Sequence, residues 1–126
     1  MPPETLGILL ISGTHERAHY AFVLATAAAA VGRRVTLFAT NAGCYALARD
    51  WSGLPDSGRD ALVRASGVAG LGDLREAAVE LGVTLMACDS GLRMAGLAAE
   101  QLLEGVEVAG VPSFLSAVGA GQMLTL

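Results

Sequence analysis

Short apolar runs alternate with longer helix-like patterns along the whole chain. The first run, residues 6–11 (LGILLI), is followed by Ser-Gly and is typical of a parallel strand buried on both faces. Residues 34–39 (RVTLFA) and 83–87 (VTLMA) are similarly rich in β-branched and apolar side chains. Two shorter runs, residues 106–109 and 122–126, follow later in the chain. The pattern predicts five strands.

Two long helices are predicted between these strands. Residues 16–31 are rich in alanine and contain neither Pro nor Gly until Gly32, which favours a buried helix that ends there. Residues 73–81 begin with D-x-x-E, the form of a capping box, and Gly82 follows. Its apolar positions recur at helical spacing, so we expect Leu81 to lie in the core and Leu81→Ala to cost more stability than Arg75→Ala.

Shorter helices are predicted at four places: residues 44–49, from Asp89 or Ser90 toward Gly96, residues 98–104, and from Pro112 toward Val118. Residues 50–72 are rich in Gly, Ser and Asp, and indicate an irregular loop with a possible helical turn at 61–65. Strands that alternate with helices require right-handed crossovers. We therefore predict a single α/β domain over residues 1–126, a three-layer α/β/α sandwich with a five-stranded parallel sheet.

Composition narrows the class of protein. Of 126 residues, 53% are hydrophobic and 16% charged, which is enough to bury a sizeable core. The net charge of −4, with arginine as the only basic residue, argues against nucleic acid as a partner. The longest nearly apolar run, residues 18–32, is shorter than the roughly 20 residues of a membrane span. The start of the chain has no charged region typical of a signal peptide, so we expect a cytoplasmic protein with two thiols rather than a disulfide.

Candidate chemistry lies in the segments that follow the first three strands, because ligands bind beyond the carboxyl ends of parallel strands. These segments read SGTHERAH, TNAGCYA and ACDSG, and none is a G-x-G-x-x-G motif or, without lysine, a P-loop. They supply the candidate pocket residues Gly13, His15, Glu16, Asn41, Gly43, Cys44, Asp89 and Ser90.

Cys88 is the strongest candidate for a reactive residue. It stands at a strand end and before a helix, where unpaired backbone N–H groups and the helix dipole favour a thiolate. We expect it to be partly exposed with a lowered pKa, although a cysteine at a strand end can also simply fill space. Asp89 is expected to cap the helix, and Arg93 to solvate its surface.

The second cysteine and the histidines favour structural interpretations. The neighbours of Cys44 indicate packing, and whether its thiol can reach Cys88 depends on a strand order that the sequence leaves open. His15 and His19 would share a helix face, but solvated side chains are expected rather than metal ligands. We expect no metal site and no organic cofactor.

Three segments together resemble the DsrE/DsrF-like family, in particular its peroxiredoxin-like or DsrE-type sulfur-carrier branch. They are SGTHERAHYAFVLATAAAAVGRRVTLFAT, LGDLREAAVELGVTLMACDSGLRMAGL and LLEGVEVAGVPSFLSAV. The features that match are Glu16 in an acidic loop, the strand Val35-Thr36-Leu37-Phe38, and Cys88 with Gly96 behind it. The chain departs from one branch in having Ala39-Thr40-Asn41-Ala42-Gly43 where an aromatic turn stands, and Cys44 has no counterpart.

The resemblance implies a sulfur-relay protein whose Cys88 receives sulfane sulfur as a persulfide and passes it to an acceptor thiol. It implies sulfur donor and acceptor proteins as partners, and a homo-oligomer, trimer or hexamer. Whether this makes the protein an enzyme, a sulfurtransferase, stays open. The alternative is a non-catalytic α/β module that binds a ligand at the same strand ends or serves in an assembly. Peroxide reduction is disfavoured, because the activating Arg and Thr of a peroxidatic cysteine cannot be placed in the sequence.

Overall fold

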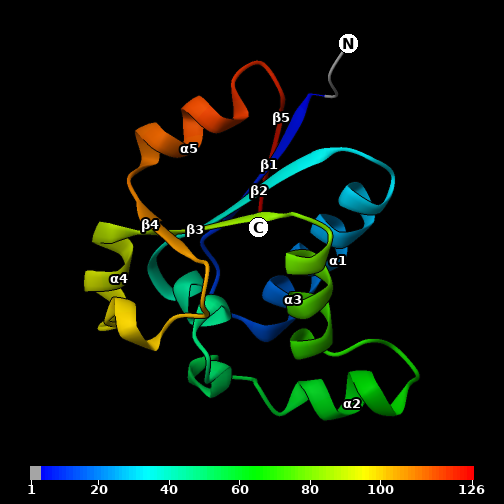
Figure 1. The fold of residues 1–126 in the computed structure, drawn as a ribbon. Coiled ribbons are helices and arrows are strands. Elements are labelled where there is room, and N and C mark those ends of the chain that lie inside the picture. The colour runs from blue at the N-terminus through cyan, green and yellow to red at the C-terminus, as the bar shows by residue number, and fades with distance from the viewer. Residues whose placement is uncertain (1–3) are drawn as a thin grey trace.

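A single five-stranded parallel sheet forms the centre of the protein (Figure 1). The computed structural model describes residues 4–126, so the first three residues of the predicted domain lie outside it. The strand order is β4-β3-β2-β1-β5, and every neighbouring pair is parallel. This confirms the predicted fold class and adds the strand order, which places β2 beside β3. The strands are β1 (Thr5–Leu10), β2 (Arg34–Ala39), β3 (Thr84–Cys88), β4 (Glu107–Ala109) and β5 (Gln122–Thr125).

The helices follow the predicted alternation, with differences between residues 40 and 104. They are α1 (His15–Ala30), α2 (Arg59–Ala65), α3 (Leu71–Glu80), α4 (Asp89–Ala95) and α5 (Val111–Val118). The short helices predicted at 44–49 and 98–104 are instead the 3-10 turns η1 (Asn41–Leu47) and η3 (Ala99–Gln101). The predicted loop at 50–72 contains the 3-10 turn η2 (Trp51–Gly53) and the whole of α2. No helix within residues 4–126 is both long and apolar enough to cross a bilayer.

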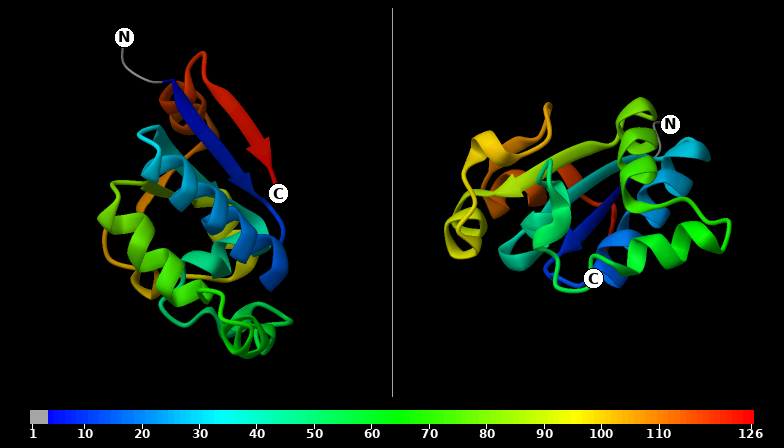
Figure 2. Two further views of the ribbon diagram at one scale, coloured as in Figure 1. Left: turned by 90° about the vertical axis from the view of Figure 1, so that its right-hand side faces the viewer. Right: turned by 90° about the horizontal axis from the view of Figure 1, so that it is seen from below.

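Helices cover both faces of the sheet, which gives three layers (Figure 2). On one face, Ile8 and Leu37 pack with Phe22 of α1 in the larger core cluster. On the other face, α5 packs through Phe114, whose ring stacks on Phe38 with 4.9 Å between ring centroids. The close seating of α5 requires a glycine on β1, since a Cβ at Gly7 would lie 2.3 Å from Val118 Cγ2.

The buried face of α3 differs from the predicted one. Arg75 is only 7% exposed, whereas Leu81, expected in the core, is 47% exposed and lies just past the end of the helix. The helix begins at Leu71, before the predicted start, and Gly70 rather than Asp73 is its N-cap. Its inner face is therefore Leu71, Arg75 and Ala78, at i, i+4 and i+7.

Arg75 is buried because it satisfies the carbonyl groups at the end of η1. Its Nη1 donates to the carbonyl oxygens of Ala46 (3.1 Å) and Ala48 (2.5 Å), and its Nη2 to that of Arg49 (3.4 Å). A buried carbonyl without a partner is costly, and an arginine fork can reach several at once. Hydrophobic periodicity counts only apolar residues as buried, so it does not recognise a buried arginine. The sequence pattern therefore assigns the wrong face of α3 to the core.

We expect Arg75→Met to destabilise the protein by about 3 kcal/mol, since it keeps the apolar stem but leaves buried carbonyls unpaired. Leu81→Ala should cost less than about 1 kcal/mol, because the side chain is half exposed. Urea unfolding of both variants measures the difference. Equal losses would show that Arg75 has no special role.

Candidate functional site

The turn after β2 and the start of α4 meet at the carboxyl edge of the sheet. Gly91 of α4 packs directly on this turn: a Cβ at this position would lie 2.6 Å from both Thr40 Oγ1 and Asn41 N. Because β2 and β3 are neighbours, the residues that follow each strand are held together here. This contact brings the Thr40 hydroxyl close to the end of β3.

Cys88 is the last residue of β3 and also the N-cap of α4. Its Sγ accepts a hydrogen bond from Gly91 N (3.4 Å) and lies 3.2 Å from Ser90 Oγ. The thiol belongs to the α5 side of the sheet, in a cluster with Phe38 and Met86. The residue is only 3% exposed, so the expectation of partial exposure is wrong. The sequence cannot show that the capping role turns the sulfur inward.

The surroundings of Cys88 favour its thiolate. Burial by itself raises the pKa of this thiol, but the Ser90 and Thr40 hydroxyls and the N–H groups of Gly91 and Ser90 together hold the pKa below its ordinary value. Hydrogen-bond donors to the sulfur stabilise the charged form. The lowered pKa agrees with the expectation, although the groups that produce it are side-chain and backbone donors around the N-cap.

Thr40 is the residue that sequence reasoning missed. It precedes the candidate residues Asn41 and Gly43 in the same turn, but nothing in its spacing relates it to Cys88. Only the pairing of β2 with β3 brings the two together. Its position directly after β2 is the one signal that pointed to it.

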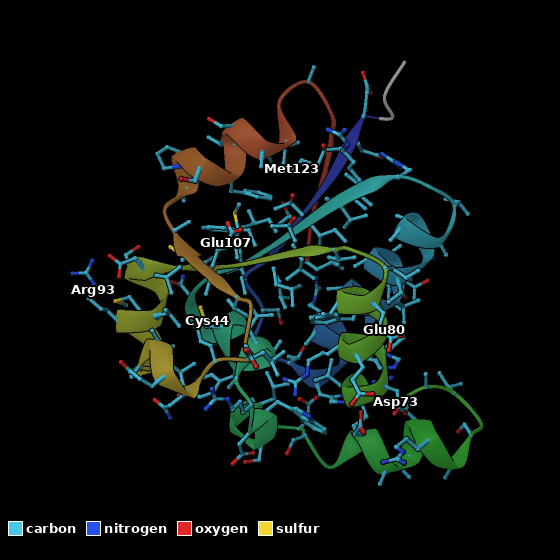
Figure 3. The ribbon with its side chains drawn as sticks, viewed as in Figure 1. Cys44, Asp73, Glu80, Arg93, Glu107 and Met123 are labelled. Atoms are coloured by element: carbon cyan, nitrogen blue, oxygen red, sulfur yellow. The ribbon has the colours of Figure 1, made fainter. Side chains whose placement is uncertain are left out.

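Cys44 has the opposite environment. It is fully buried in η1, and its Sγ donates to the carbonyl oxygen of Ala39 (3.5 Å). Burial raises its pKa to about 11, and the negative charge of a Cys88 thiolate adds to the rise. Both thiols are free. Figure 3 shows Cys44 inside the molecule, whereas Arg93 of α4 points to solvent.

His15 and His19 are buried, contrary to the expectation that they are solvated. An arginine can only donate, so His15 Nδ1 accepts from Arg59 Nη1 (3.3 Å), and its Nε2 carries the proton that it donates to Asp60 Oδ1 (2.9 Å). His19 Nε2 donates to the carbonyl oxygen of Ala69 (2.8 Å). The segment expected to be a loop covers both rings, and they anchor it to α1.

These histidines do not form a metal site with their neighbours. Across residues 4–126, the structure has no group of three or more His, Cys, Asp or Glu side chains arranged to hold a metal ion. The rings of His15 and His19 stack on each other, with centroids 5.7 Å apart.

The two predicted acidic site residues point to solvent. Glu16 faces Arg59 at 3.5 Å. Asp89 pairs with Arg93 at 2.7 Å, so it does not cap α4, and Arg93 has a specific partner on its own helix. The expectation of an Asp89 cap is wrong because Cys88 occupies that position.

The predicted glycines hold the edge of the sheet together. A Cβ at Gly43 would lie 2.3 Å from the carbonyl oxygen of Leu10, and one at Gly13 would lie 2.6 Å from Ala42 Cβ. Asn41 is the one non-glycine residue among the described residues with a positive φ, 51°. These close approaches seat η1 on the end of β1. Of the predicted set, the structure brings Ser90 onto Cys88, while Asn41 lies in the turn beneath Gly91.

Hydroxyl and amide donors that lower the pKa of Cys88 increase the share of the nucleophilic thiolate at a given pH. The second thiol, with its raised pKa, stays protonated under the same conditions. The geometry therefore supports chemistry at one sulfur atom.

Comparison with known proteins gives one family and a common fold. The family model described as "DsrE/DsrF-like family" matches residues 6–126. The uncharacterized protein YrkE of Bacillus subtilis (strain 168) is 26% identical over 147 aligned positions, which cover 92% of each chain. The crystal structure of YchN from E. coli superimposes with a TM-score of 0.74 at 16% identity, over 98% of this chain and 99% of that one. MTH1491 from Methanobacterium thermoautotrophicum gives 0.60 at 19% identity, with the same coverage. At these identities the two structures show a shared fold.

Thr40→Val and Ser90→Ala should each raise the pKa of Cys88, because each removes a donor to the thiolate. The measurement is the ultraviolet absorbance of the thiolate against pH, in a Cys44→Ala background so that one thiol titrates. Ser66→Ala, which removes an exposed hydroxyl at the end of α2, is the matched control and should change nothing. A Cys88 midpoint at or above the ordinary value of about 8.5 in the parent would contradict the assignment.

Proposed function

The chain belongs to the DsrE/DsrF-like family, and from this membership we propose that it carries sulfane sulfur as a persulfide on Cys88. A sulfur-relay type of role is supported for the family as a whole. For this chain, the supporting observation is the Cys88 thiol, whose pKa is lowered by the donors around it. The Cys88 thiol would receive a sulfur atom from one protein and pass it to another.

The transfer needs only thiolate chemistry. The Cys88 thiolate attacks the outer sulfur of a donor persulfide, R–S–SH; the donor S–S bond breaks, a new S–S bond forms on Cys88, and the donor leaves as R–S⁻. The outer sulfur keeps its proton through this step. An acceptor thiolate then attacks the same outer sulfur, and Cys88 leaves as a thiolate. Sulfur atoms and electrons balance without an external oxidant or reductant.

The same donors act in both steps. Ser90 Oγ and Gly91 N stabilise the Cys88 thiolate that attacks, and they stabilise it again when it leaves. The near-complete burial of the residue shields a bound persulfide from thiols in bulk solution. Loading therefore requires local opening around Ser90, which is exposed at the rim of the site.

Cys44 is not needed in this mechanism. Its pKa is raised to about 11, so the thiol stays protonated at neutral pH and is a poor nucleophile there. We assign it to packing of η1 against β2. Cys44 and Cys88 are not joined in a disulfide, which suits the cytoplasmic location that we propose.

A second function is favoured by the burial of Cys88. Its Sγ already has a structural role, because it accepts the Gly91 N–H as the N-cap of α4. A protein that uses this sulfur only as a cap would be a non-catalytic ligand-binding module or a subunit of an assembly.

We also propose a homo-oligomer, a trimer or hexamer, that associates through α5. The inner side of α5 is buried through Phe114 and Val118, yet Val111 and Leu115 on the same helix are about half exposed. Met123 of β5, which pairs with Gly7 under α5, is exposed to a similar extent. A helix with apolar side chains on both sides favours a protein partner.

Cys88→Ser should abolish persulfide loading, while Cys44→Ser loads like the parent. After incubation with a sulfane-sulfur donor, intact-mass spectrometry should show a gain of about 32 Da, one sulfur atom, on the parent and on Cys44→Ser only. A folded Cys44→Ser protein that fails to load would replace the mechanism with a two-thiol one. A parent that never loads would favour the non-catalytic function.

Leu115→Glu should convert the oligomer to a monomer, because it places a charge in the proposed contact. Light scattering at micromolar concentration measures the mass. Leu62→Glu, at a more exposed leucine on α2, is the control and should leave the mass unchanged. A parent with the mass of one chain would contradict the oligomer.

A further inference from the structure

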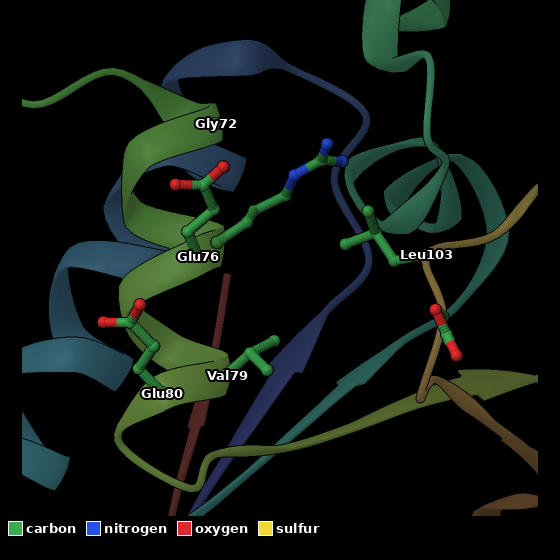
Figure 4. A pocket seen from close by; sticks show the side chains of 7 residues that line it. Gly72, Glu76, Val79, Glu80 and Leu103 are labelled. Carbon is green, nitrogen blue, oxygen red and sulfur yellow. The ribbon is translucent and has the colours of Figure 1, made fainter.

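An acidic groove with an apolar floor runs along the outer side of α3. It is built from other elements than the thiol site, and the proposed sulfur transfer does not use it. It encloses about 430 Å³ between α3 and the segment after η3. We call it the α3 groove and define it by Glu76, Val79, Glu80, Leu103 and Glu104, with Gly72 at one end. Figure 4 shows Val79 and Leu103 facing each other across it, with Glu76 and Glu80 on the α3 side.

The floor of the groove exposes apolar surface that the fold does not use. Val79 is 54% exposed although α3 packs against the core through its other face. Leu103, on the other side of the groove, is only partly buried. A second hollow of about 220 Å³ shares Val79 and Glu104 and reaches Glu107 on the edge strand β4, but Val83 and Leu85 in its lining are buried. The exposed apolar side chains are therefore those of the α3 groove, and exposed apolar surface in a groove is typical of a site that binds a partner.

The charge of the groove is negative. Within residues 4–126, no ion pair joins Glu76, Glu80, Glu104 or Glu107 to a basic side chain. The one basic residue in the lining is Arg75, and its guanidinium is turned inward onto the carbonyls at the end of η1. Carboxylates around an apolar floor complement a segment that carries both apolar and basic side chains.

The apolar floor favours a peptide over a small cation. Val79 and Leu103 offer no ligand to a metal ion or an ammonium group, whereas apolar side chains of a peptide can cover them. Arg75 is only 7% exposed and its Nε is buried, so this side chain forms part of the wall and does not act as a donor to a ligand.

The geometry points to the α3 groove as the docking site for a basic amphipathic helix of another protein. Leucine-type side chains of that helix would lie between Val79 and Leu103, and its Lys or Arg side chains would face Glu76, Glu80 and Glu104. Glu76 and Glu80 are one helical turn apart, so basic residues at a matching spacing can face both. This inference is independent of the thiol chemistry.

The test uses the full chain and a fluorescent peptide of about four helical turns, roughly 14 residues, with one face of leucine and the other of lysine. An isomeric peptide has the same composition without an apolar face. Fluorescence anisotropy should show saturable binding of the first peptide and clearly weaker binding of the second. Cys88→Ser should bind like the parent, so failure of the persulfide mechanism does not affect this result.

Glu76→Gln, Glu80→Gln and Glu104→Gln combined should weaken binding about tenfold, as should Val79→Ser alone. The matched control removes three carboxylates outside the groove, with Glu4→Gln, Asp73→Asn and Glu100→Gln, and should stay within about twofold of the parent. These positions are all exposed, so each variant should fold. Gly72→Phe, where an added Cβ meets nothing within 4 Å, should block one end of the groove.

Three results would overturn the proposal: equal binding of the isomeric peptide, equal loss in the control variant, or displacement of the peptide by spermidine at similar concentrations. The first two indicate attraction to net charge alone, and the third indicates a small-cation site. A fourth result, peptide binding that is lost when copies of the chain associate through this face rather than through α5, would overturn it as well, because a second copy would then cover the groove.

Discussion

α4 packs closely on the turn after β2 because Gly91 has no side chain. A Cβ there would lie 2.6 Å from Thr40 Oγ1 and from Asn41 N, so a larger residue must push the helix away. Because Gly91 also donates its N–H to Cys88 Sγ, its position sets how the thiol is capped. The Thr40 hydroxyl, which also lowers the pKa of Cys88, lies against the same glycine. The character of the thiol thus follows from backbone packing at the sheet edge.

The contrast between the two cysteines comes from the same arrangement. Cys88 ends β3 and Cys44 follows the neighbouring β2, yet their surroundings differ: hydroxyl and amide donors prevail around Cys88, whereas burial prevails around Cys44, whose thiol donates to a carbonyl. One pKa is lowered and the other is raised to about 11. The turn η1, which holds Cys44 and follows Thr40, is fixed at its far end by Arg75 of α3. The α3 groove and the thiol site therefore share a structural support while presenting separate surfaces.

The sequence predicted the features that depend on local pattern. Apolar runs of strand length gave the parallel sheet, and the position of Cys88 between a strand and a helix gave its lowered pKa. Features that depend on strand order were out of reach: Thr40 is separated from Cys88 by 48 positions and meets it only because β2 pairs with β3. Arg75 and His15 were misjudged for a related reason. Hydrophobic periodicity treats polar side chains as exposed, whereas these two are buried to satisfy partners distant in sequence.

The most direct measurement compares Gly91→Ala with Gly72→Ala, a matched pair of helical glycines of which only the first has close neighbours. In each variant, the titration of Cys88 is followed by NMR of its Cβ, with the fold monitored in the same spectra. If the Gly91 contact sets the thiolate, Gly91→Ala raises the pKa of Cys88 and slows persulfide loading while the sheet stays intact, and Gly72→Ala changes neither. An unchanged Cys88 pKa in a folded Gly91→Ala protein would contradict the account.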